Sequence, residues 1–323
     1  MNHLKAIQST IEPDLARLNE RIAVRLRSSN ELMNTVIENY LKVKGKQIRP
    51  ILVMLSARLL GDVNDRVISS AAAVELLHNA SLIHDDVVDD TRVRRGVTTI
   101  NGLWDNHIAV LVGDFFVSTA LLEAMSTGDT RAVACVANLG KLLSLGEIDQ
   151  IYNARFHQLS EEAYFGVINR KTASLFVACV EMGAYAVDAD EETLVHLRRY
   201  AELLGLCFQI KDDIFDYFDD EKIGKPTGND LREGKITLPL LHVLLGEESD
   251  EAPMLQLSRK EQLNEEEIQQ LIEYAKAGGG IEYAYGRMAD LYEEARRELE
   301  YLPAGPDRDA FDGLFRYVIS RDS

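Results

Sequence analysis

The sequence has few residues that would break or cross-link a helical chain. Only 7 of its 323 residues are proline, and none lies between Pro50 and Pro226. Because proline breaks helix interiors, its absence permits long helices over this interval. Cysteine is equally scarce: the 3 cysteines are far apart and show no CxxC spacing. This usage favours small core residues in a reducing compartment over a disulfide set or a zinc site.

Long apolar runs and excess positive charge are lacking as well. We find no run of 18 or more apolar residues that would span a membrane, and the first residues form an acid-containing helical pattern rather than a signal peptide. The expected location is therefore the cytoplasm. Against 35 Lys and Arg stand 53 Asp and Glu, a formal net charge of −18. Such an acidic surface argues against a general affinity for nucleic acid or anionic lipid, but it leaves room for a local basic pocket.

Apolar residues recur at helical spacing along most of the chain. Ile51, Leu55 and Leu59, for example, are four residues apart and would share one helix face. We predict helices over 4–27, 31–42, 48–60, 65–88, 104–125, 129–157, 160–185, 189–219, 234–245, 264–277, 281–300 and 308–320. The one credible linker is the acidic, proline-containing segment 246–263. No composition shift marks a second domain, so we expect a single all-α domain over 1–323, built as a helical bundle around a central cavity.

Two acidic clusters with the same DDxxD spacing follow apolar helical runs. Asp85, Asp86 and Asp89 form the first cluster, and Asp212, Asp213 and Asp216 form the second. On a helix, residues three and four apart share a face, and like charges packed there are unfavourable without a cation. Carboxylates, phosphate oxygens and water together suit Mg²⁺. One cluster alone could be a solvated helix end, but two identical spacings favour two metal motifs that face each other across a cavity around one diphosphate.

A scattered set of cations and polar residues accompanies the two motifs. Arginine binds phosphate as a planar fork and lysine as a point charge, so an enzyme that handles diphosphates needs such groups. His78 lies two turns before Asp85 on the same helix face; a lone histidine there is more often structural, but its place above the metal motif makes it a candidate diphosphate contact. Gln209 lies three residues before Asp212, so it is expected to point into the same cavity. The remaining candidates, each of which could alone be ordinary surface charge or polarity, are Lys46, Arg49, Arg94, Arg95, Lys171, Thr172, Lys225 and Lys235.

Several stretches resemble, in order and spacing, the trans-isoprenyl (polyprenyl) diphosphate synthases, and most closely the longer-chain bacterial members such as octaprenyl diphosphate synthase. The resemblance covers nearly the whole chain and rests on GKQIRP, ELLHNASLIHDDVVDDTRVRRG, LVGDFF, NRKTASLF, CFQIKDDIFDY and IGKPTGNDLREGKITLPLL. The family joins isopentenyl diphosphate to an allylic diphosphate such as farnesyl diphosphate in a Mg²⁺-dependent reaction.

The resemblance implies a role for each matching residue. Asp85, Asp86 and Asp89 would hold two Mg²⁺ ions, and Asp212 a third, supported by Asp213 and Asp216. Further implied contacts are Arg94, Lys171, Lys225 and Lys235 with the allylic diphosphate, Lys46, Arg49, His78 and Arg95 with isopentenyl diphosphate, and Thr172 and Gln209 along the path of the carbocation. One departure is Gln47, where the family usually has a third basic residue, which would weaken isopentenyl diphosphate binding slightly.

Two rival functions share some of these features. A terpene cyclase ionises an allylic diphosphate but needs no second diphosphate site, so Lys46, Arg49, His78 and Arg95 argue against it. A catalytically silent subunit of a heteromeric synthase would be expected to lose acidic residues from one motif, and here both are complete. The sequence leaves open the preferred primer, the exact product length, the need for an unlike subunit and the downstream pathway.

Product length and assembly give two further expectations. Ala80 and Ser81 are small, so they cannot plug a product tunnel below the first motif; the floor would lie deeper, near Leu77 or around Phe115 and Phe116. A product in the hexaprenyl to decaprenyl range follows, unless the small residues serve only close helix packing. The segments 104–125 and 129–157 carry more apolar residues than one buried face needs, and the resemblance implies a dimer through this region, so we expect a symmetric homodimer.

Overall fold

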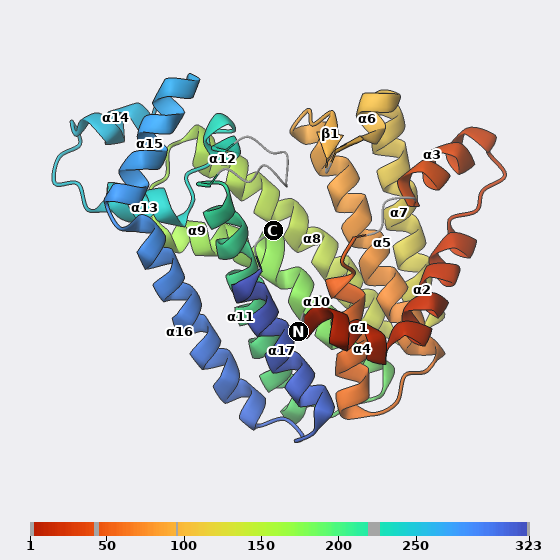
Figure 1. Ribbon diagram of the computed structural model, residues 1–323. Helices are drawn as coiled ribbons and strands as arrows, with labels where there is room; N and C mark the ends of the chain where they lie inside the picture. The colour runs from red at the N-terminus through yellow and green to blue at the C-terminus, as the bar shows by residue number, and fades with distance from the viewer. Residues whose placement is uncertain (1–2, 42–44, 95, 219–226, 322–323) are drawn as a thin grey trace. The chain divides into compact units, whose positions relative to one another are not determined.

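The computed structural model describes residues 3–41, 45–94, 96–218 and 227–321, which are almost entirely helical (Figure 1). In this described part, strands are limited to the hairpin of β1 (Val93–Arg94) and β2 (Val97–Thr98), which pair antiparallel with Val93 opposite Thr98. The helices are α1 (His3–Thr10), α2 (Glu12–Arg25), α3 (Glu31–Leu41), α4 (Ile48–Leu60), α5 (Asp65–Val88), α6 (Ile100–Leu103), α7 (Asn106–Ser126), α8 (Thr130–Arg155), α9 (Glu161–Ile168), the π-helical turn η1 (Asn169–Ala173), α10 (Ser174–Ala186), α11 (Glu191–Phe215), α12 (Asn229–Arg232), α13 (Leu238–Leu245), α14 (Pro253–Ser258), α15 (Glu265–Ala277), α16 (Gly280–Glu300) and α17 (Pro306–Ser320).

The all-α prediction is confirmed, but the helix expected over 234–245 begins at Leu238, and three other segments are organised differently from those expected. The segment 4–27 is two helices, because Pro13 lies in the first turn of α2 and a helix ends before such a proline. The segment 160–185 is interrupted by η1. The linker 246–263 contains the short helix α14, which also begins at a proline.

The chain divides into two compact units, which are described separately. Unit 1 comprises Met1–Lys141, Leu175–Ala201 and Glu298–Leu314, and unit 2 comprises Leu142–Ser174, Glu202–Arg297 and Phe315–Ser323. The single domain over 1–323 stays a prediction.

Unit 1 is built around α5, which packs mainly against α7 and also against α4 and α2 (Figure 1). Buried residues lie on every side of α5, as expected for a helix surrounded by neighbours. The helix begins at Asn64, whose side chain accepts a hydrogen bond from the Val67 N–H at 3.1 Å. Arg21 and Arg25 of α2 form ion pairs with the fully buried Glu123 of α7. These ion pairs link α2 to α7 in addition to the packing of α2 against α5.

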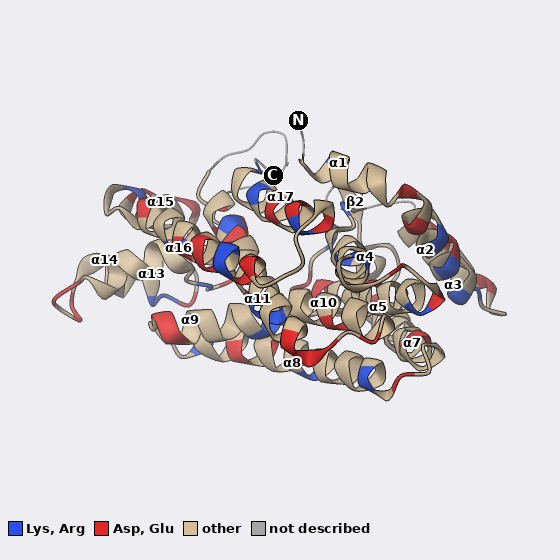
Figure 2. Ribbon diagram, turned by 90° about the horizontal axis from the view of Figure 1, so that it is seen from below, with Lys and Arg blue, Asp and Glu red and all other residues tan. Residues whose placement is uncertain are grey.

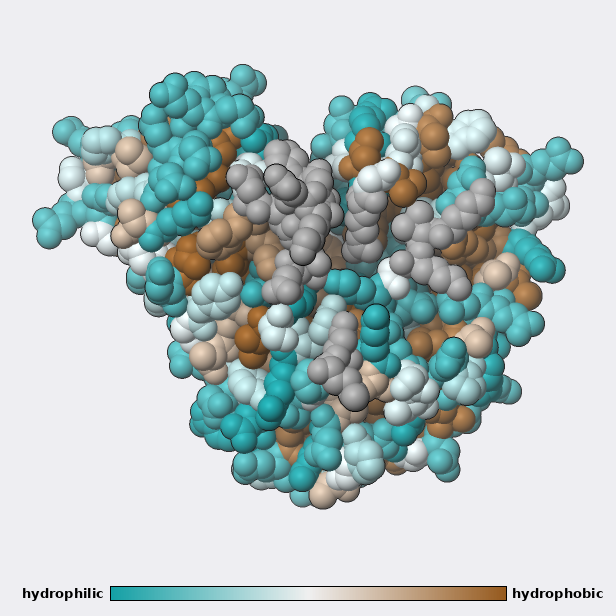
Figure 3. All heavy atoms as spheres, in the orientation of Figure 1, coloured by the Kyte–Doolittle hydropathy of each residue, from teal (hydrophilic) through white to brown (hydrophobic). Residues whose placement is uncertain are grey.

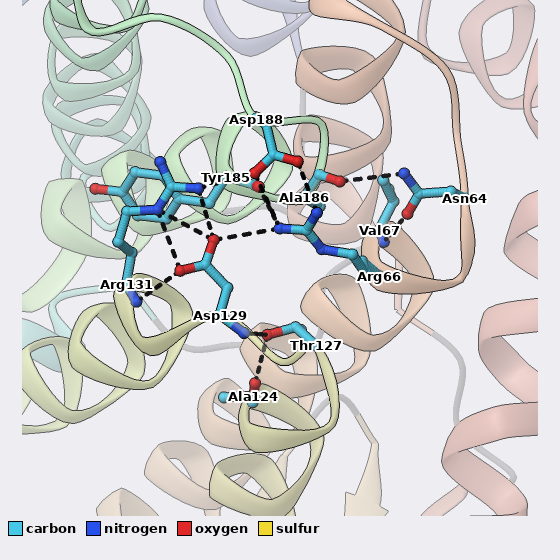
Figure 4. A network of polar contacts seen from close by, with 10 residues as sticks. All are labelled: Asn64, Arg66, Val67, Ala124, Thr127, Asp129, Arg131, Tyr185, Ala186 and Asp188. Carbon is cyan, nitrogen blue, oxygen red and sulfur yellow. Dashed lines mark hydrogen bonds and ion pairs between the residues drawn. The ribbon is translucent and has the colours of Figure 1, made fainter.

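Four charged residues form a network in unit 1 at the start of α5, the start of α8 and just after α10 (Figure 4). Arg66 of α5 forms ion pairs with Asp188 at 2.8 Å and Asp129 at 3.2 Å, and Arg131 of α8 pairs with Asp129 at 2.7 Å. Arg131, through its hydrogen bonds, holds the pKa of Asp129 below its ordinary value. This network ties the start of α5 to the start of α8 and to the residues that follow α10.

The helix α7 is long and apolar enough to cross a membrane by length and composition alone. Its buried residues, among them Val112, Phe116 and Ala120, instead pack within unit 1, and α5 is its main neighbour. We therefore interpret α7 as a core helix of unit 1 and not as a membrane span.

Unit 2 contains α9, η1, α13, α15 and most of α16, with α13 packed against both α9 and α15. The helix α15 begins with a capping box between Asn264 and Glu267, which satisfies backbone N–H groups at its first turn. Charged residues of both signs are interspersed along α16 (Figure 2), as expected for a helix with one solvated face.

Candidate active site

The first aspartate motif forms the end of α5 in unit 1. Asp85 and Asp86 lie in the last turn, and Asp89 caps the helix with its N–H donated to the Asp85 carbonyl at 2.8 Å. Asp85 and Asp89 are half-buried, whereas Asp86 is only 7% exposed. The helical spacing predicted from the sequence is therefore present.

The buried Asp86 is held by Arg94 of β1 and by Asn101 of α6. Arg94 Nε donates to Asp86 Oδ1 at 2.7 Å. Burial raises the pKa of Asp86, and the charge of Arg94 counteracts this rise. Asn101, which is fully buried, donates its side-chain N–H to the Asp86 carbonyl at 2.9 Å. Arg94 is thus placed at the first motif, although its partner in this structure is a carboxylate.

The expected isopentenyl diphosphate residues of unit 1 lie on α4, on α5 and just before α4. Lys46 is exposed, and the Arg49 guanidinium lies over the Phe176 ring at 5.9 Å from its centroid. His78 is half-buried on α5. Gln47 has a positive φ of 53° and donates to the Asn19 side chain at 2.9 Å, so it serves the entry into α4. Two candidates, Arg95 and Lys225, lie outside the described residues.

The candidate chain-length residues also belong to unit 1. Leu77 and Ala80 are buried on α5, and the Ser81 hydroxyl donates to the His78 carbonyl at 2.8 Å. The helix α7, with Phe115 half-buried and Phe116 fully buried, packs along α5 as expected for a facing wall. Their roles in product length stay predictions.

The second aspartate motif ends α11 in unit 2. Asp212 and Asp213 lie in the last turn of α11, and Asp216 follows it. The Asp216 carboxylate accepts the backbone N–H groups of Asn229 at 2.9 Å and Asp230 at 3.0 Å, so it also caps α12. The Asp212 side chain is 41% exposed, whereas Asp213 is buried.

A chain of hydrogen bonds fixes Asp213. Thr172 donates to Gln209 Oε1 at 2.7 Å, and Gln209 Nε2 donates to Asp213 Oδ1 at 2.8 Å. The Tyr164 hydroxyl donates to Asp213 Oδ2 at 2.6 Å. Burial raises the pKa of Asp213 to about 7, while the hydrogen bonds from Tyr164 and Gln209 oppose the rise. The structure therefore brings together Thr172, Gln209 and Asp213, three of the residues proposed from the sequence.

These residues line a cavity of about 200 Å³ within unit 2. The two candidate cations on its wall are Lys171 and Lys235. Lys171 forms an ion pair with Glu147, and Lys235 with Glu233. Each lysine on the cavity wall thus lies beside a carboxylate.

The π-helical turn η1 places Lys171 and Thr172 on this wall. Such single π turns occur often at functional sites. Gly146 of α8 makes room for the turn, since a Cβ at Gly146 would lie 2.8 Å from the backbone nitrogen of Lys171. The widened turn is therefore built into the packing of unit 2.

Sequence reasoning missed several residues that hold the motifs. Tyr164 and Asn101 carry no local signal, because their partners lie 49 and 15 residues away. Arg321 donates to Asp212 Oδ1 at 2.6 Å and stacks over the Phe208 ring at 3.9 Å. Asp230 shares the cavity wall, and burial raises its pKa well above the ordinary value; its stretch was part of the family resemblance, but no role was assigned to it.

The donor set fits Mg²⁺ completed by a substrate. Among the described residues, no three Asp, Glu, His or Cys side chains form a ready-made metal cage. Mg²⁺ is typically bound by one or two carboxylates, with substrate phosphates and water completing its octahedral shell. Asp85 and Asp89, half-buried at the helix end, and the exposed Asp212 meet this requirement.

Comparison with known proteins decides the family. The polyprenyl synthetase family profile matches residues 30–275. The chain belongs to the polyprenyl synthetase family. It is 33% identical to octaprenyl diphosphate synthase from Escherichia coli (strain K12). The alignment spans 321 residues and covers 99% of both chains.

Solved structures of polyprenyl synthases share the all-α fold. A decaprenyl diphosphate synthase from Rhodobacter capsulatus superposes with a TM-score of 0.92 at 33% identity, over 98% of both chains. A polyprenyl synthase from Caulobacter crescentus CB15, complexed with calcium and isoprenyl diphosphate, gives a TM-score of 0.91 at 34% identity, over 99% of this chain and 98% of that one. Both the predicted family and its isoprenoid synthase fold are confirmed.

Proposed function

We propose that this polyprenyl synthetase catalyses the Mg²⁺-dependent head-to-tail condensation of isopentenyl diphosphate with an allylic diphosphate. The products are a medium- to long-chain all-trans polyprenyl diphosphate and pyrophosphate. The observation that carries the proposal is the pair of complete DDxxD motifs, each ending an apolar helix, in a chain of this family. The relative from Caulobacter crescentus, solved with a divalent cation and isoprenyl diphosphate, supports the same ligand classes here.

The residues divide the chemical work. Asp85, Asp86, Asp89 and Asp212 would hold three Mg²⁺ ions, with Asp213 and Asp216 supporting them; when bound, the ions neutralise charge on the departing pyrophosphate. Arg94, Lys171 and Lys235 would exchange their carboxylate partners for allylic diphosphate oxygens, and the proposed role of Lys225 is the same. Lys46, Arg49, His78 and Arg95 would bind isopentenyl diphosphate. Thr172 and Gln209 would present oxygens to the developing carbocation.

The hydrogen-bonded chain in unit 2 supports the proposed roles of Thr172 and Gln209 along the path of the carbocation. Thr172 donates to Gln209, which in turn donates to Asp213, so both side chains are held in fixed orientations on the cavity wall. A carbocation formed there would meet fixed oxygen dipoles in place of free water. Pyrophosphate, once released, is a plausible acceptor for the proton that is lost after condensation.

The rival functions are not favoured. A terpene cyclase would have no use for the Lys46, Arg49 and His78 set, and the named relatives join isoprene units. A silent subunit is expected to have lost acidic residues from one motif, and both motifs of this chain are complete. The need for an unlike subunit in addition to this chain is a separate question that the same experiment answers.

The test is incubation of the purified protein with Mg²⁺, radiolabelled isopentenyl diphosphate and farnesyl diphosphate, followed by chromatography of the dephosphorylated products. We expect labelled polyprenols in the hexaprenyl to decaprenyl range, and none after chelation of the metal. A cyclic product from farnesyl diphosphate alone would indicate a cyclase. No incorporation by this chain in the presence of Mg²⁺ would refute catalysis by the chain on its own.

We also propose a homodimer. In unit 1, α7 exposes Leu111, Leu122 and Met125, each more than 60% exposed, and in unit 2, α8 exposes Ile148 and Tyr152. Exposed apolar stripes of this kind mark interaction surfaces. Light scattering at micromolar concentration should report a dimer, and Leu122→Glu should dissociate it, whereas Val195→Glu on an exposed position of α11 should not. A monomeric wild-type protein would contradict the proposal.

Two coarser features complete the proposed function. We propose one domain over 1–323, which predicts a single cooperative unfolding transition. We propose action in the cytoplasm, because Cys179 and Cys207 are free and buried and α7 packs as a core helix. Two separate unfolding transitions would refute the first proposal, and secretion of the protein by its native cell would refute the second.

A further inference from the structure

A glycine in the middle of α7 has a specific neighbour. A Cβ added at Gly113 would lie 2.2 Å from His84 Nε2 and 2.5 Å from His84 Cδ2, far inside any allowed contact. The imidazole therefore lies directly against the Gly113 backbone. Glycine inside a helix costs roughly 0.5–1 kcal/mol relative to alanine. The close approach of His84 gives the physical reason for accepting that cost in an otherwise apolar core helix.

The imidazole also makes polar contacts with the same turn of α7. His84 Nε2 lies 3.3 Å from the Val110 carbonyl oxygen and 3.4 Å from Asp114 Oδ1. Both partners are acceptors, so the contact requires a hydrogen on Nε2. Val110, Gly113 and Asp114 thus form one seat, into which the ring fits by shape and by hydrogen bonding.

This seat lies next to the first aspartate motif. His84 immediately precedes Asp85 and Asp86 in the last turns of α5. Asp86 is already held by Arg94 of β1 and Asn101 of α6. The contact with α7 fastens the same helix end to a second element, so that the carboxylates are held from two directions. Outer groups that orient metal ligands in this way commonly change metal affinity or activity by 10- to 100-fold when they are altered.

We propose that His84 is a positioning residue for Asp85 and Asp86, and that Gly113 forms the notch that makes its position possible. The inference rests on the proposed role of these aspartates in binding Mg²⁺. Neither His84 nor Gly113 contacts the substrates in this account; each acts through the placement of the carboxylates.

The test measures metal affinity directly. Mn²⁺ serves as a paramagnetic substitute for Mg²⁺, and its binding to the purified protein with inorganic pyrophosphate is followed by electron paramagnetic resonance of the free ion. The sites of interest are those that Asp86→Ala removes. Gly113→Ala should weaken Mn²⁺ at these sites by about tenfold or more, because the new methyl group displaces the ring. The matched control is Gly286→Ala, at an exposed position inside α16 with open space around it, which should leave the affinity unchanged.

A double-mutant cycle separates positioning from general damage. In a His84→Ala background there is no ring to displace, so adding Gly113→Ala should weaken Mn²⁺ binding by less than about twofold. Fully additive losses would overturn the proposal. His84→Gln keeps an N–H that can reach the Val110 carbonyl, so it should recover most of the affinity lost in His84→Ala; equal losses in both would also overturn it.

Two outcomes distinguish this inference from the metal assignment beneath it. If Asp86→Ala does not reduce Mn²⁺ binding, both the metal assignment and the positioning role are wrong. If Asp86→Ala abolishes binding while Gly113→Ala and His84→Ala leave it intact, only the positioning role is wrong. Far-ultraviolet circular dichroism of each variant confirms that the helices are retained, and the two His84 variants carry the test if Gly113→Ala does not fold.

Discussion

The hydroxyl of Tyr164 offers the sharpest test of how the second motif is tuned. Tyr164 is 7% exposed and donates to Asp213 Oδ2 at 2.6 Å. A hydrogen bond to a charged group contributes about 1.5–3 kcal/mol, which corresponds to about 1–2 pKa units. Burial already raises the pKa of Asp213 to about 7. In Tyr164→Phe, only the hydrogen bond from Gln209 would stabilise the ionised carboxylate of Asp213. The pKa of Asp213 should therefore rise to about 8–9.

This shift predicts a change in Mg²⁺ binding that depends on pH. Metal ligands and their supports must lose their protons for tight binding, so the apparent Mg²⁺ affinity should increase with pH until Asp213 is ionised. At pH 7 about half of Asp213 is ionised in the native protein, against roughly 1–10% in Tyr164→Phe. The affinity at pH 7 should therefore fall by about 5- to 50-fold and recover near pH 9. The apparent Mg²⁺ affinity is measured by calorimetric titration of Mg²⁺ into the protein in the presence of pyrophosphate, from pH 6 to 9.

A second buried tyrosine provides the control. The Tyr217 hydroxyl lies 3.2 Å from Thr237 Oγ1 and accepts the Leu240 N–H at 3.3 Å. Tyr217→Phe should lower stability by about 1 kcal/mol but leave the pH midpoint of Mg²⁺ binding in place. An unchanged midpoint in Tyr164→Phe, or the same displacement in both variants, would refute the tuning of Asp213 by Tyr164.

The raised pKa of Asp213 also determines how the unfolding free energy changes with pH. The folded protein keeps the proton of Asp213 up to about pH 7, whereas the unfolded chain loses it near the ordinary value of 3.8. The contribution of Asp213 to the unfolding free energy is therefore fully present below about pH 4 and is lost as the pH rises to about 7. In urea unfolding of the metal-free protein, Tyr164→Phe should extend this loss to higher pH.

Four further changes test other parts of the structure. Asp85→Ala should lower kcat by about 100-fold or more in saturating Mg²⁺, and near-normal turnover would refute its metal role. Arg49→Ala should raise KM for isopentenyl diphosphate about tenfold, measured in steady-state assays, with a smaller effect on the allylic KM; equal effects would mean that its site is wrongly assigned. Ser81→Phe should shorten the chromatographed product toward farnesyl or geranylgeranyl, and an unchanged profile in an active variant would exclude the tunnel. Asp129→Asn should reduce urea stability by up to about 1 kcal/mol at neutral pH; because the pKa of Asp129 is lowered, the difference should vanish as the pH falls through that pKa, and a difference that persists in acid would contradict an ionic origin.

Local sequence was sufficient for the long helices and for the spacing within each motif. The helices predicted over 48–60 and 65–88 coincide with α4 and α5. Helical hydrogen bonds join residues four apart, so apolar periodicity and the Asn64 cap carry the necessary information within one or two turns. The DDxxD spacing likewise needs only the helix itself to place its carboxylates on one face. The break before α2 also has a local cause, because Pro13 lies in the first turn of that helix.

Tertiary structure alone decided what surrounds those carboxylates. Tyr164 reaches Asp213 across 49 residues, and Arg321 reaches Asp212 across 109. Periodicity shows which face of a helix is buried but not which side chain of another helix meets it, because that depends on how the helices pack. The seat of His84 on Gly113 has the same origin: in the sequence, Gly113 is one glycine in an apolar run, and only the close approach of α5 and α7 shows why a larger residue would not fit.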